Sequence, residues 1–553
     1  MKIRLSEIRM EIDEDKDKLL ETACEKLQIK KQHVKNWWIE RQSLDARRKR
    51  DIYFVYTIVV EVADDNLPNI NVKFTDKDLE IINEEKEEQI ISGNTYLSYP
   101  PVVVGMGPSG LFAAWQLAKL GYKPLVLERG KNVFAREHDV AKFWQDGTLN
   151  TESNVQFGEG GAGTFSDGKL TTRIKDKRVK LILDTLIKAG APPEIAYLAK
   201  PHLGTDKLRK IAANLRREII SCGGKVFFQS KVTGFKISEG KVGALIVNDK
   251  FELPVSMCVL AIGHSARDTY RALYENDVQM EAKPFAIGLR VEHPQHMIDY
   301  AQFGKWAGNP RLGAADYHLS YRNKELNRAA YTFCMCPGGY VIGASSEENK
   351  LTVNGMSYHG RSSGISNSAV VVAVGEKDYD YSKPLSGMEF QEKWEKKAYN
   401  LGGGDFVAPV QTVDDFIKDT VKQTSSRLMQ ASYKPAVKEA NLRDCLPEEI
   451  GETLSEALQD FDKKIWGFAS NKGILTGIET RTSAPLKISR GRDFQAVGIH
   501  GLYPIGEGAG YAGGIISAAV DGVKAAQMIV SVHSKPNKIY TQDFLQEFDL
   551  EEE

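Results

Sequence analysis

A glycine-rich turn between a short apolar strand and a helix constrains this chain most. The motif Gly105-x-Gly107-x-x-Gly110 follows the apolar run 101–104 and precedes a helix-like segment, 111–120. Gly105 permits a tight turn, Gly107 lets backbone approach a pyrophosphate, and Gly110 allows close packing of helix on strand. The helix N-terminus would offer free N–H groups and the positive end of its dipole to phosphates. The motif therefore predicts a Rossmann-type dinucleotide site.

An acidic residue lies at the expected distance from this turn. Glu128 ends the next predicted strand, 123–128, eighteen residues past Gly110. An acid at that place accepts hydrogen bonds from ribose hydroxyls. The same carboxylate would repel the 2′-phosphate of a tightly held NADP.

A second glycine-rich segment near the far end of the chain favours FAD over NAD. A strand from Leu502 leads into Gly506-Glu507-Gly508, and a helix is expected to begin at Gly513-Gly514. The acid can meet a ribityl hydroxyl, and the helix N-terminus can face the N1–C2=O edge of a flavin. Another strand–helix turn without a ligand stays an open alternative.

Length and composition indicate a multidomain globular protein whose overall charge would not attract nucleic acid or an anionic membrane. The chain has 553 residues, 42% hydrophobic and 27% charged, with a formal net charge of −1. No signal-peptide pattern and no apolar stretch long enough to span a bilayer are found. The six cysteines include no CxxC pair, so no disulfide scaffold and no metal site are predicted, and a cytoplasmic location is expected.

The predicted fold class is α/β, with a FAD-binding domain interrupted by a mixed α+β substrate domain. A small N-terminal α+β domain is expected to precede them, with strands at 3–12 and 52–62 and a helix at 15–27. The expected domains are 1–90 (N-terminal), 97–275 and 471–535 (FAD-binding), 276–470 (inserted) and 536–553 (peripheral tail).

The chain resembles a known group of flavoproteins. The residues that carry the resemblance are 102–111, Leu127-Glu-Arg-Gly130, 154–170, Cys334-Met-Cys-Pro-Gly-Gly-Tyr340, 479–485 and 503–510. They are similar to FAD flavoproteins with two dinucleotide-binding domains and, more narrowly, to the bacterial FAD-dependent (NAD(FAD)-utilising) dehydrogenases. Neither a second GxGxxG domain for NAD(P)H nor a redox Cys-x(4)-Cys is found, so any nicotinamide would visit transiently.

The resemblance implies a larger set of cofactor contacts. The loop 160–169 would lie along pyrophosphate and flavin, Arg136 would neutralise phosphate charge, and Val232 would lie by the adenine or serve packing alone. The predicted cofactor-binding residues are Gly105, Gly107, Pro108, Ser109, Gly110, Glu128, Arg129, Arg136, Gly160, Gly161, Ala162, Gly163, Thr164, Ser166, Asp167, Gly168, Lys169, Val232, Ala261, Ile262, Gly263, Gly506, Glu507, Gly508, Gly513, Gly514 and Ile515.

Five residues are candidates for chemistry. Cys334 and Cys336 would point to the same side of a strand, either as a redox dithiol or as packing. His359 and Arg361 lie in a polar loop that could supply a proton donor and an anion site, or be solvated surface. Arg481 could anchor a substrate carboxylate or phosphate. His264 is expected to be structural.

The expected function is hydride transfer between flavin N5 and a small organic substrate, with NAD(P)H as a candidate transient donor. Two alternatives stay open. Basic residues around Trp37 and Trp38, within 30–50, could hold RNA for a flavin-dependent modification, although a solvated face is the commoner reason for such a run. The flavin could also be structural.

Overall fold

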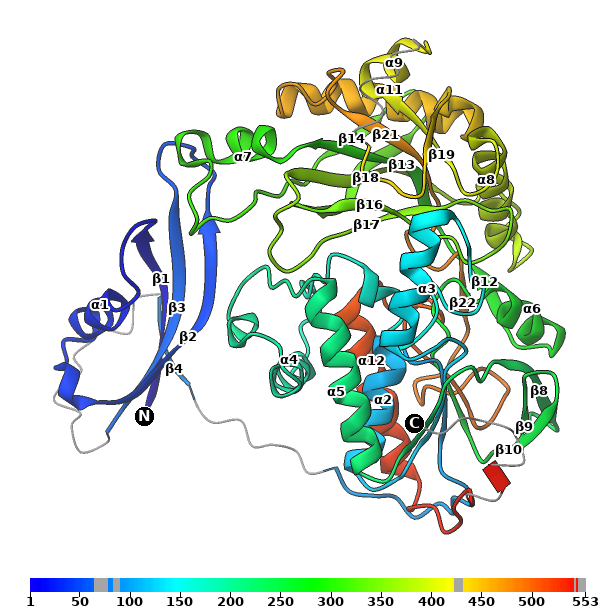
Figure 1. The fold of residues 1–553 in the computed structure, drawn as a ribbon. Coiled ribbons are helices and arrows are strands. Elements are labelled where there is room, and N and C mark those ends of the chain that lie inside the picture. The colour runs from blue at the N-terminus through cyan, green and yellow to red at the C-terminus, as the bar shows by residue number, and fades with distance from the viewer. Residues whose placement is uncertain (64–77, 83–89, 422–430, 542–543, 546–553) are drawn as a thin grey trace.

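The computed structural model describes residues 1–63, 78–82, 90–421, 431–541 and 544–545. Segments 64–77 and 83–89 of the predicted N-terminal domain and linker, and 546–553 of the predicted tail, lie outside the described residues. Figure 1 shows an N-terminal sheet with helix α1 (Lys18–Leu27) beside it, a domain built on a parallel sheet, and an inserted domain above that one. The predicted α/β class is confirmed.

The central parallel sheet has the strand order β23-β11-β5-β6-β7. Its strands are short and buried, as expected where both faces are covered. They are β5 (Val102–Val104), β6 (Leu125–Leu127), β7 (Lys225–Phe227), β11 (Cys258–Leu260) and β23 (Leu502–Pro504). The predicted strand at 101–104 and the strand leading to Glu128 are therefore both present, at the middle of this sheet.

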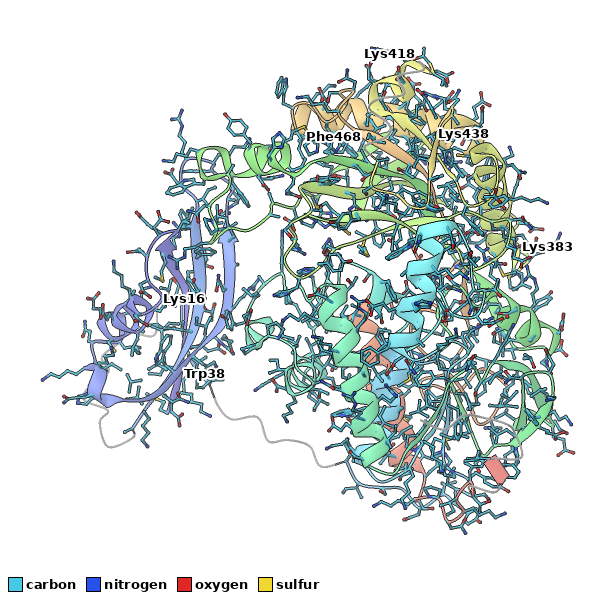
Figure 2. All side chains as sticks on the ribbon, in the orientation of Figure 1. Lys16, Trp38, Lys383, Lys418, Lys438 and Phe468 are labelled. Atoms are coloured by element: carbon cyan, nitrogen blue, oxygen red, sulfur yellow. The ribbon has the colours of Figure 1, made fainter. Side chains whose placement is uncertain are left out.

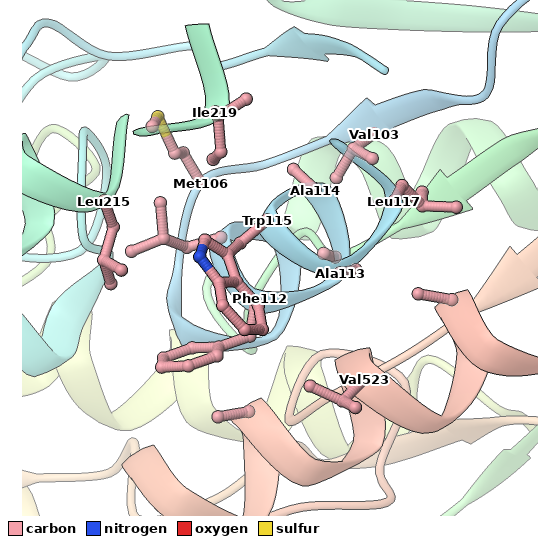
Figure 3. Close-up of a cluster of buried hydrophobic side chains, with 14 of the residues drawn as sticks. Val103, Met106, Phe112, Ala113, Ala114, Trp115, Leu117, Leu215, Ile219 and Val523 are labelled. Atoms are coloured by element: carbon pink, nitrogen blue, oxygen red, sulfur yellow. The ribbon is translucent and has the colours of Figure 1, made fainter. Parts of the chain in front are cut away.

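The two faces of this sheet pack on different elements because side chains alternate along a strand. Val103 packs with helices α2 (Pro108–Lys119), α5 (Thr205–Ser221), α4 (Arg178–Lys188) and α12 (Ile515–Val532). Figure 3 shows Phe112 and Trp115 of α2 between Leu215 and Val523 in this core. Val102 and Val104 face a three-stranded antiparallel meander, β8 (Val232–Ser238), β9 (Lys241–Val247) and β10 (Phe251–Pro254).

The inserted domain contains a seven-stranded sheet, β14-β15-β18-β13-β21-β19-β20. One face packs on helices α8 (Ser386–Gly402) and α11 (Glu448–Lys464), and this interface contains Ile287 and Leu289. The strands are β13 (Phe285–Pro294), β14 (Ser320–Asn323), β15 (Arg328–Cys336), β18 (Ile365–Val374), β19 (Ala408–Thr412), β20 (Val437–Glu439) and β21 (Ile474–Glu479). Arg290 and Phe333 therefore lie on the opposite face, toward the parallel sheet.

Smaller elements connect the two domains. An antiparallel ribbon of β12 (Met280–Ala282) and β22 (Leu486–Ile488) lies where the chain enters and leaves the inserted domain. Helix α3 (Val133–Asp146) and a hairpin, β16 (Tyr340–Gly343) with β17 (Val353–Met356), pack between the sheets. Helices α6 (Arg267–Glu275), α7 (Gln295–Phe303) and α9 (Val413–Lys418) lie at the periphery (Figure 1).

In the described residues of the N-terminal unit, helix α1 accompanies a four-stranded antiparallel sheet of order β2-β3-β1-β4. Its elements are β1 (Lys2–Glu11), α1 (Lys18–Leu27), β2 (Val34–Asp45), β3 (Tyr53–Val62) and β4 (Leu79–Ile82). Trp38 lies on the edge strand β2 and is 38% exposed (Figure 2). The same strand forms a backbone hydrogen bond with the parallel-sheet domain: the Gln42 N–H donates to the Tyr197 carbonyl at 2.7 Å.

Two observations depart from the sequence expectations. Helix α12 is long and apolar enough to cross a membrane, although no such stretch was expected; 61% of it is buried and it packs along α2, as a core helix does. Part of the predicted peripheral tail is packed: Tyr540 is buried, stacks on Tyr99 at 5.2 Å and donates a hydrogen bond to the Pro254 carbonyl.

Candidate functional site

A large cavity lies between the carboxyl ends of the parallel strands and the free face of the inserted sheet. Its volume is about 1400 Å³, open solvent at the mouth included. Ligand sites of open parallel sheets lie at this edge, where the strand order reverses. Both glycine-rich segments found in the sequence line it, together with Cys334 and Glu479 from the inserted domain.

At one end of the cavity, the Glu128 carboxylate orders the surrounding backbone. One oxygen, Oε2, accepts the N–H of Met106 at 2.7 Å, and Oε1 accepts those of Gly130 at 2.9 Å and Gly158 at 3.0 Å. The acid therefore connects the turn after β5 to the loop after α3, besides lining the cavity. This connecting role was not expected from the sequence.

Two helix N-termini open on the cavity without a capping side chain. Helix α2 begins after Gly107 and α12 begins after Gly514, and neither N-cap residue provides a side-chain hydrogen bond. The first-turn N–H groups at such ends need a partner, and an anion supplies one. A Cβ added at Gly263 or Gly513 would meet no protein atom within 4 Å, so open space borders both backbones. The donors and the space fit a dinucleotide.

A cluster of charges lies beside the Glu128 end. Arg129 donates to Asp268 through both terminal nitrogens at 2.9 Å, and Lys231 lies 2.7 Å from the same carboxylate. Arg129 also stacks over Phe157, and Ser230, Lys231 and Val232 line the cavity next to it. The predicted residues Arg129 and Val232 thus lie at the cavity wall.

Arg136 has a different place from the predicted one. It is fully buried, does not line the cavity, and donates to the carbonyls of Asn154, Val155, Glu159 and Gly161. Burial lowers its pKa to about 10. Its guanidinium holds the loop 154–161 in shape, so the expectation that it contacts phosphate is corrected: it positions the loop that borders the cavity.

The opposite end of the cavity is a polar wall built by the inserted domain. Cys334, Asn354, Glu479 and Thr482 line it, with Phe333 beside them. The Glu479 carboxylate accepts two hydrogen bonds from Nη1 of Arg290, at 2.9 and 3.0 Å. Burial raises the pKa of Glu479 to about 7, and burial also raises that of Glu507, on the parallel-sheet side, to about 7.

The two candidate cysteines do not share one face in the way a regular strand would place them. The pairing of β15 with β18 shifts between Phe333 and Cys336, and Cys334 has a φ of 45°. This bulge turns Cys334 into the cavity, while Cys336 is fully buried and lies 3.4 Å from Nη2 of Arg290. The expectation of parallel side chains was wrong because one extra residue on β15 interrupts the alternation.

The loop with His359 and Arg361 lies outside the cavity. Arg361 donates to Asp167 at 3.0 Å, and Asp167 is buried and also accepts the Ser357 hydroxyl. His359 stacks on His202 with ring centroids 5.9 Å apart. The predicted proton donor and anion site therefore belong to a separate cluster, together with Asp167.

Arg481 lines the cavity, but its guanidinium is already engaged. It donates to Glu395 at 2.9 and 3.0 Å, to Ser346 at 2.6 Å and to Glu347 at 3.1 Å. Arg267 of α6 shares the Glu395 carboxylate at 2.7 Å. These ion pairs connect the two domains, so Arg481 acts here as a structural residue beside the site.

The cavity thus brings together most of the predicted cofactor residues. Those that line it are Gly105, Gly107, Pro108, Ser109, Glu128, Arg129, Gly161, Ala162, Gly163, Ser166, Val232, Ala261, Ile262, Gly263, Glu507, Gly513, Gly514 and Ile515. The predicted residues that do not line it are Gly110, Arg136, Gly160, Thr164, Asp167, Gly168, Lys169, Gly506 and Gly508. Of the chemical candidates, Cys334 and Arg481 line it, and Cys336, His359 and Arg361 do not.

Sequence reasoning missed several wall residues. They include Gln156, His264, Ser265, Thr269 and Glu479. His264 hydrogen-bonds Ser265, which donates to Gln156 at 3.1 Å, and burial next to Arg481 and Arg267 lowers the histidine's pKa to about 4. The only signals for them were their places near the glycine-rich motifs and, for Glu479, in the segment 479–485 that carries the resemblance.

Family models match three parts of the chain. Residues 284–482 match a FAD-dependent protein, C-terminal domain-like, and residues 103–155 match an NAD(P)-binding Rossmann-like domain. Residues 2–61 match a domain of unknown function.

Comparison with known proteins gives one near relative and more distant folds. An uncharacterized protein of Clostridium beijerinckii (strain ATCC 51743 / NCIMB 8052) is 48% identical over 536 residues, which cover 97% of this chain and 100% of that protein. A geranylgeranyl bacteriochlorophyll reductase-like protein of Thermoplasma acidophilum is 13% identical, with 83% of each chain covered and a TM-score of 0.33. The protein CtdE in complex with FAD is 11% identical, with 78% of this chain and 83% of that one covered and a TM-score of 0.31.

Proposed function

Because this chain belongs to the FAD-dependent oxidoreductase family, we propose that it is a dehydrogenase or reductase acting on a small organic substrate. FAD is its cofactor, as the glycine-rich segments predicted. When bound, FAD supplies a centre that takes up or gives back two electrons as a hydride. We place the chain in the narrower bacterial group of FAD-dependent (NAD(FAD)-utilising) dehydrogenases.

One observation supports this function above the others: the cavity joins a dinucleotide cradle to a separate polar wall. The N-terminus of α2 and the turn 105–107 would hold the pyrophosphate, and Arg129 and Val232 would border the nucleotide end. The N-terminus of α12 would face the flavin, where its dipole stabilises negative charge. The wall with Asn354 and Thr482 then remains to orient a substrate.

Two glutamates that line the cavity, one on each side, are suited to proton handling. Glu479 and Glu507 both line the cavity, and burial raises the pKa of each to about 7. A carboxyl group with a pKa near the working pH can hold or release a proton without large cost. We infer that one of them takes up or supplies the substrate proton that accompanies hydride transfer.

NADH or NADPH would reach this site transiently as an electron donor. FAD would occupy the turn 105–107 and the N-terminus of α2, the place where a dinucleotide can bind tightly. The six cysteines are free, which suits a reducing cytoplasm as the working compartment.

The first experiment is to purify the protein, record its visible spectrum, identify the released flavin and titrate the holoprotein with NADH and NADPH without oxygen. Rapid bleaching by one nicotinamide would support a nicotinamide-linked reductase and justify a screen of oxidised acceptors. FAD that neither nicotinamide reduces would contradict that donor and point to reduction by the substrate. A colourless protein that takes up no added FAD would contradict the whole proposal.

A further inference from the structure

We propose that Cys334 and Cys336 form a dithiol–disulfide pair that exchanges two electrons with FAD at the wall of the cavity. This inference rests on the proposed function, because the pair needs FAD beside it.

The bulge in β15 brings the two thiols into different environments within two residues of each other. Cys334 lines the cavity and is partly accessible, whereas Cys336 is completely buried behind it. The positive φ of Cys334 folds the strand back, and the Cys336 Sγ lies 3.2 Å from the Cys334 carbonyl oxygen. A regular strand would keep the thiols parallel and apart, so the bulge is what allows one to approach the other.

Two cations lie against this turn. Lys169 donates a hydrogen bond to the Met335 carbonyl, between the two cysteines. Arg290 donates to the Cys334 carbonyl at 2.6 Å and approaches the Cys336 sulfur at 3.4 Å. Both cations favour a thiolate, since a nearby positive charge stabilises the ionised form.

The carboxylates that face the same turn act in the opposite direction. Asp167 pairs with Lys169 at 3.5 Å, and Glu479 pairs with Arg290. Glu507 also faces Cys334 across the cavity. The net outcome is asymmetric: hydrogen bonding with Cys336 and the charges of Lys169 and Arg290 lower the pKa of Cys334, and burial raises that of Cys336 well above its usual value.

A thiolate beside a thiol is the form that dithiol oxidation needs. Other cysteines of the described chain lack such surroundings: burial raises the pKa of Cys445 to about 12 and also raises those of Cys24 and Cys258. The combination of cavity access, a neighbouring thiol and two cations therefore distinguishes Cys334.

The exchange balances without a further reagent. The Cys336 S–H bond breaks and an S–S bond forms between Cys334 and Cys336, so the dithiol is oxidised. The two electrons and the one remaining proton pass to FAD, which is reduced. In the reverse direction the disulfide is reduced and FAD is returned to its oxidised form.

The test follows both thiols and the flavin without oxygen, in the full-length protein. A tryptic peptide of residues 329–350 contains Cys334 and Cys336 and no other cysteine. In one arm, apoprotein with reduced thiols receives one equivalent of oxidised FAD. In the other, apoprotein oxidised with diamide receives one equivalent of chemically reduced FAD. Acid quenching, alkylation and mass spectrometry then count the free thiols of the peptide.

We expect FAD absorbance and the thiol count of this peptide to change together in at least one arm, because the equilibrium must lie on one side. Cys336→Ser is expected to bind FAD and to abolish the coupled change, and Cys334→Ser to do the same. Cys222→Ser, a partly exposed cysteine outside the cavity, is the matched control and should leave the exchange unaltered.

Three results would overturn the inference: diamide fails to join the two cysteines, neither arm shows a coupled change, or the Cys336→Ser protein exchanges electrons as the wild type does. A protein whose FAD is bleached by a nicotinamide while residues 329–350 keep both thiols would refute the dithiol and leave the proposed function standing. A protein that binds no FAD would refute the proposed function, while the diamide result alone would still report on the pairing of the thiols.

Discussion

The carboxylate of Glu128, at the end of β6, accepts a hydrogen bond from the backbone N–H of Met106, with 2.7 Å between Oε2 and N. This bond joins the acid of the second parallel strand to the glycine turn that follows the first. Since the same side chain also accepts the N–H groups of Gly130 and Gly158, it shapes the cradle as well as bordering it.

Glu128→Ala should therefore weaken FAD binding at least tenfold. Three buried donors lose their acceptor, and each unsatisfied group costs about 1–3 kcal/mol. The dissociation constant of FAD, measured by fluorescence quenching on reconstituted apoprotein, checks this. Glu275→Gln, an exposed acid at the end of α6, is the control, and equal affinities in all three proteins would contradict the role given to Glu128.

Gly513→Val should separate folding from cofactor binding. A Cβ at this position meets no protein atom within 4 Å, and the residue lines the cavity at the start of α12. The new side chain would occupy space that FAD needs, so we expect an unchanged melting temperature of the apoprotein and FAD affinity reduced at least about tenfold. Gly243→Val, on an exposed strand position of β9, should change neither quantity. A Gly513→Val protein that still binds FAD normally would show that the cofactor does not approach α12.

Glu507→Gln should remove a pH-dependent cost of folding. Burial raises the pKa of Glu507 from 4.5 to about 7, against the opposing charge of Lys283. The folded state then keeps a proton that the unfolded chain loses, so wild-type stability relative to the variant falls as pH rises from about 4.5 to 7 and stays low above it. The difference should reach at most ~3 kcal/mol near pH 8 and vanish near pH 4. Urea unfolding of the apoprotein across this range measures it, with Glu376→Gln as control; a pH-independent difference would contradict the assignment.

Glu395→Gln should destabilise the junction between the two domains. This buried carboxylate pairs with Arg267 and Arg481, which together hold its pKa far below the usual range. Removing its charge leaves two buried guanidinium groups short of a partner, a loss of about 3–5 kcal/mol at pH 7. Because the folded pKa is depressed, the wild type's advantage is present above pH about 4.5 and declines as pH falls below it. Denaturant unfolding at pH 7 and pH 4 tests this, and Glu389→Gln on the same helix should behave as wild type.

The cradle could be predicted from sequence because its constraints are local. Gly105, Gly107 and Gly110 each meet a steric need within one strand–turn–helix unit, and the spacing to Glu128 follows from the length of that unit. The segment from Gly506 to Gly514 was recognised for the same reason. These features determined the fold class and the cofactor.

Only the tertiary structure decided what surrounds the reacting end of the cavity. A one-residue bulge in β15 against β18 sends Cys334 into the cavity and Cys336 behind it, and a strand's own periodicity carries no sign of such a bulge. Arg136 and Arg481 are residues of the type that binds anions, yet loop carbonyls occupy the donors of Arg136 and carboxylates those of Arg481. Arg361 pairs with Asp167, and the His359 ring lies by the Leu203 carbonyl, so neither side chain faces the cavity. Which partner a side chain meets depends on other segments, from 18 residues away for Arg136 to 194 for Arg361, and that information is absent from any local pattern.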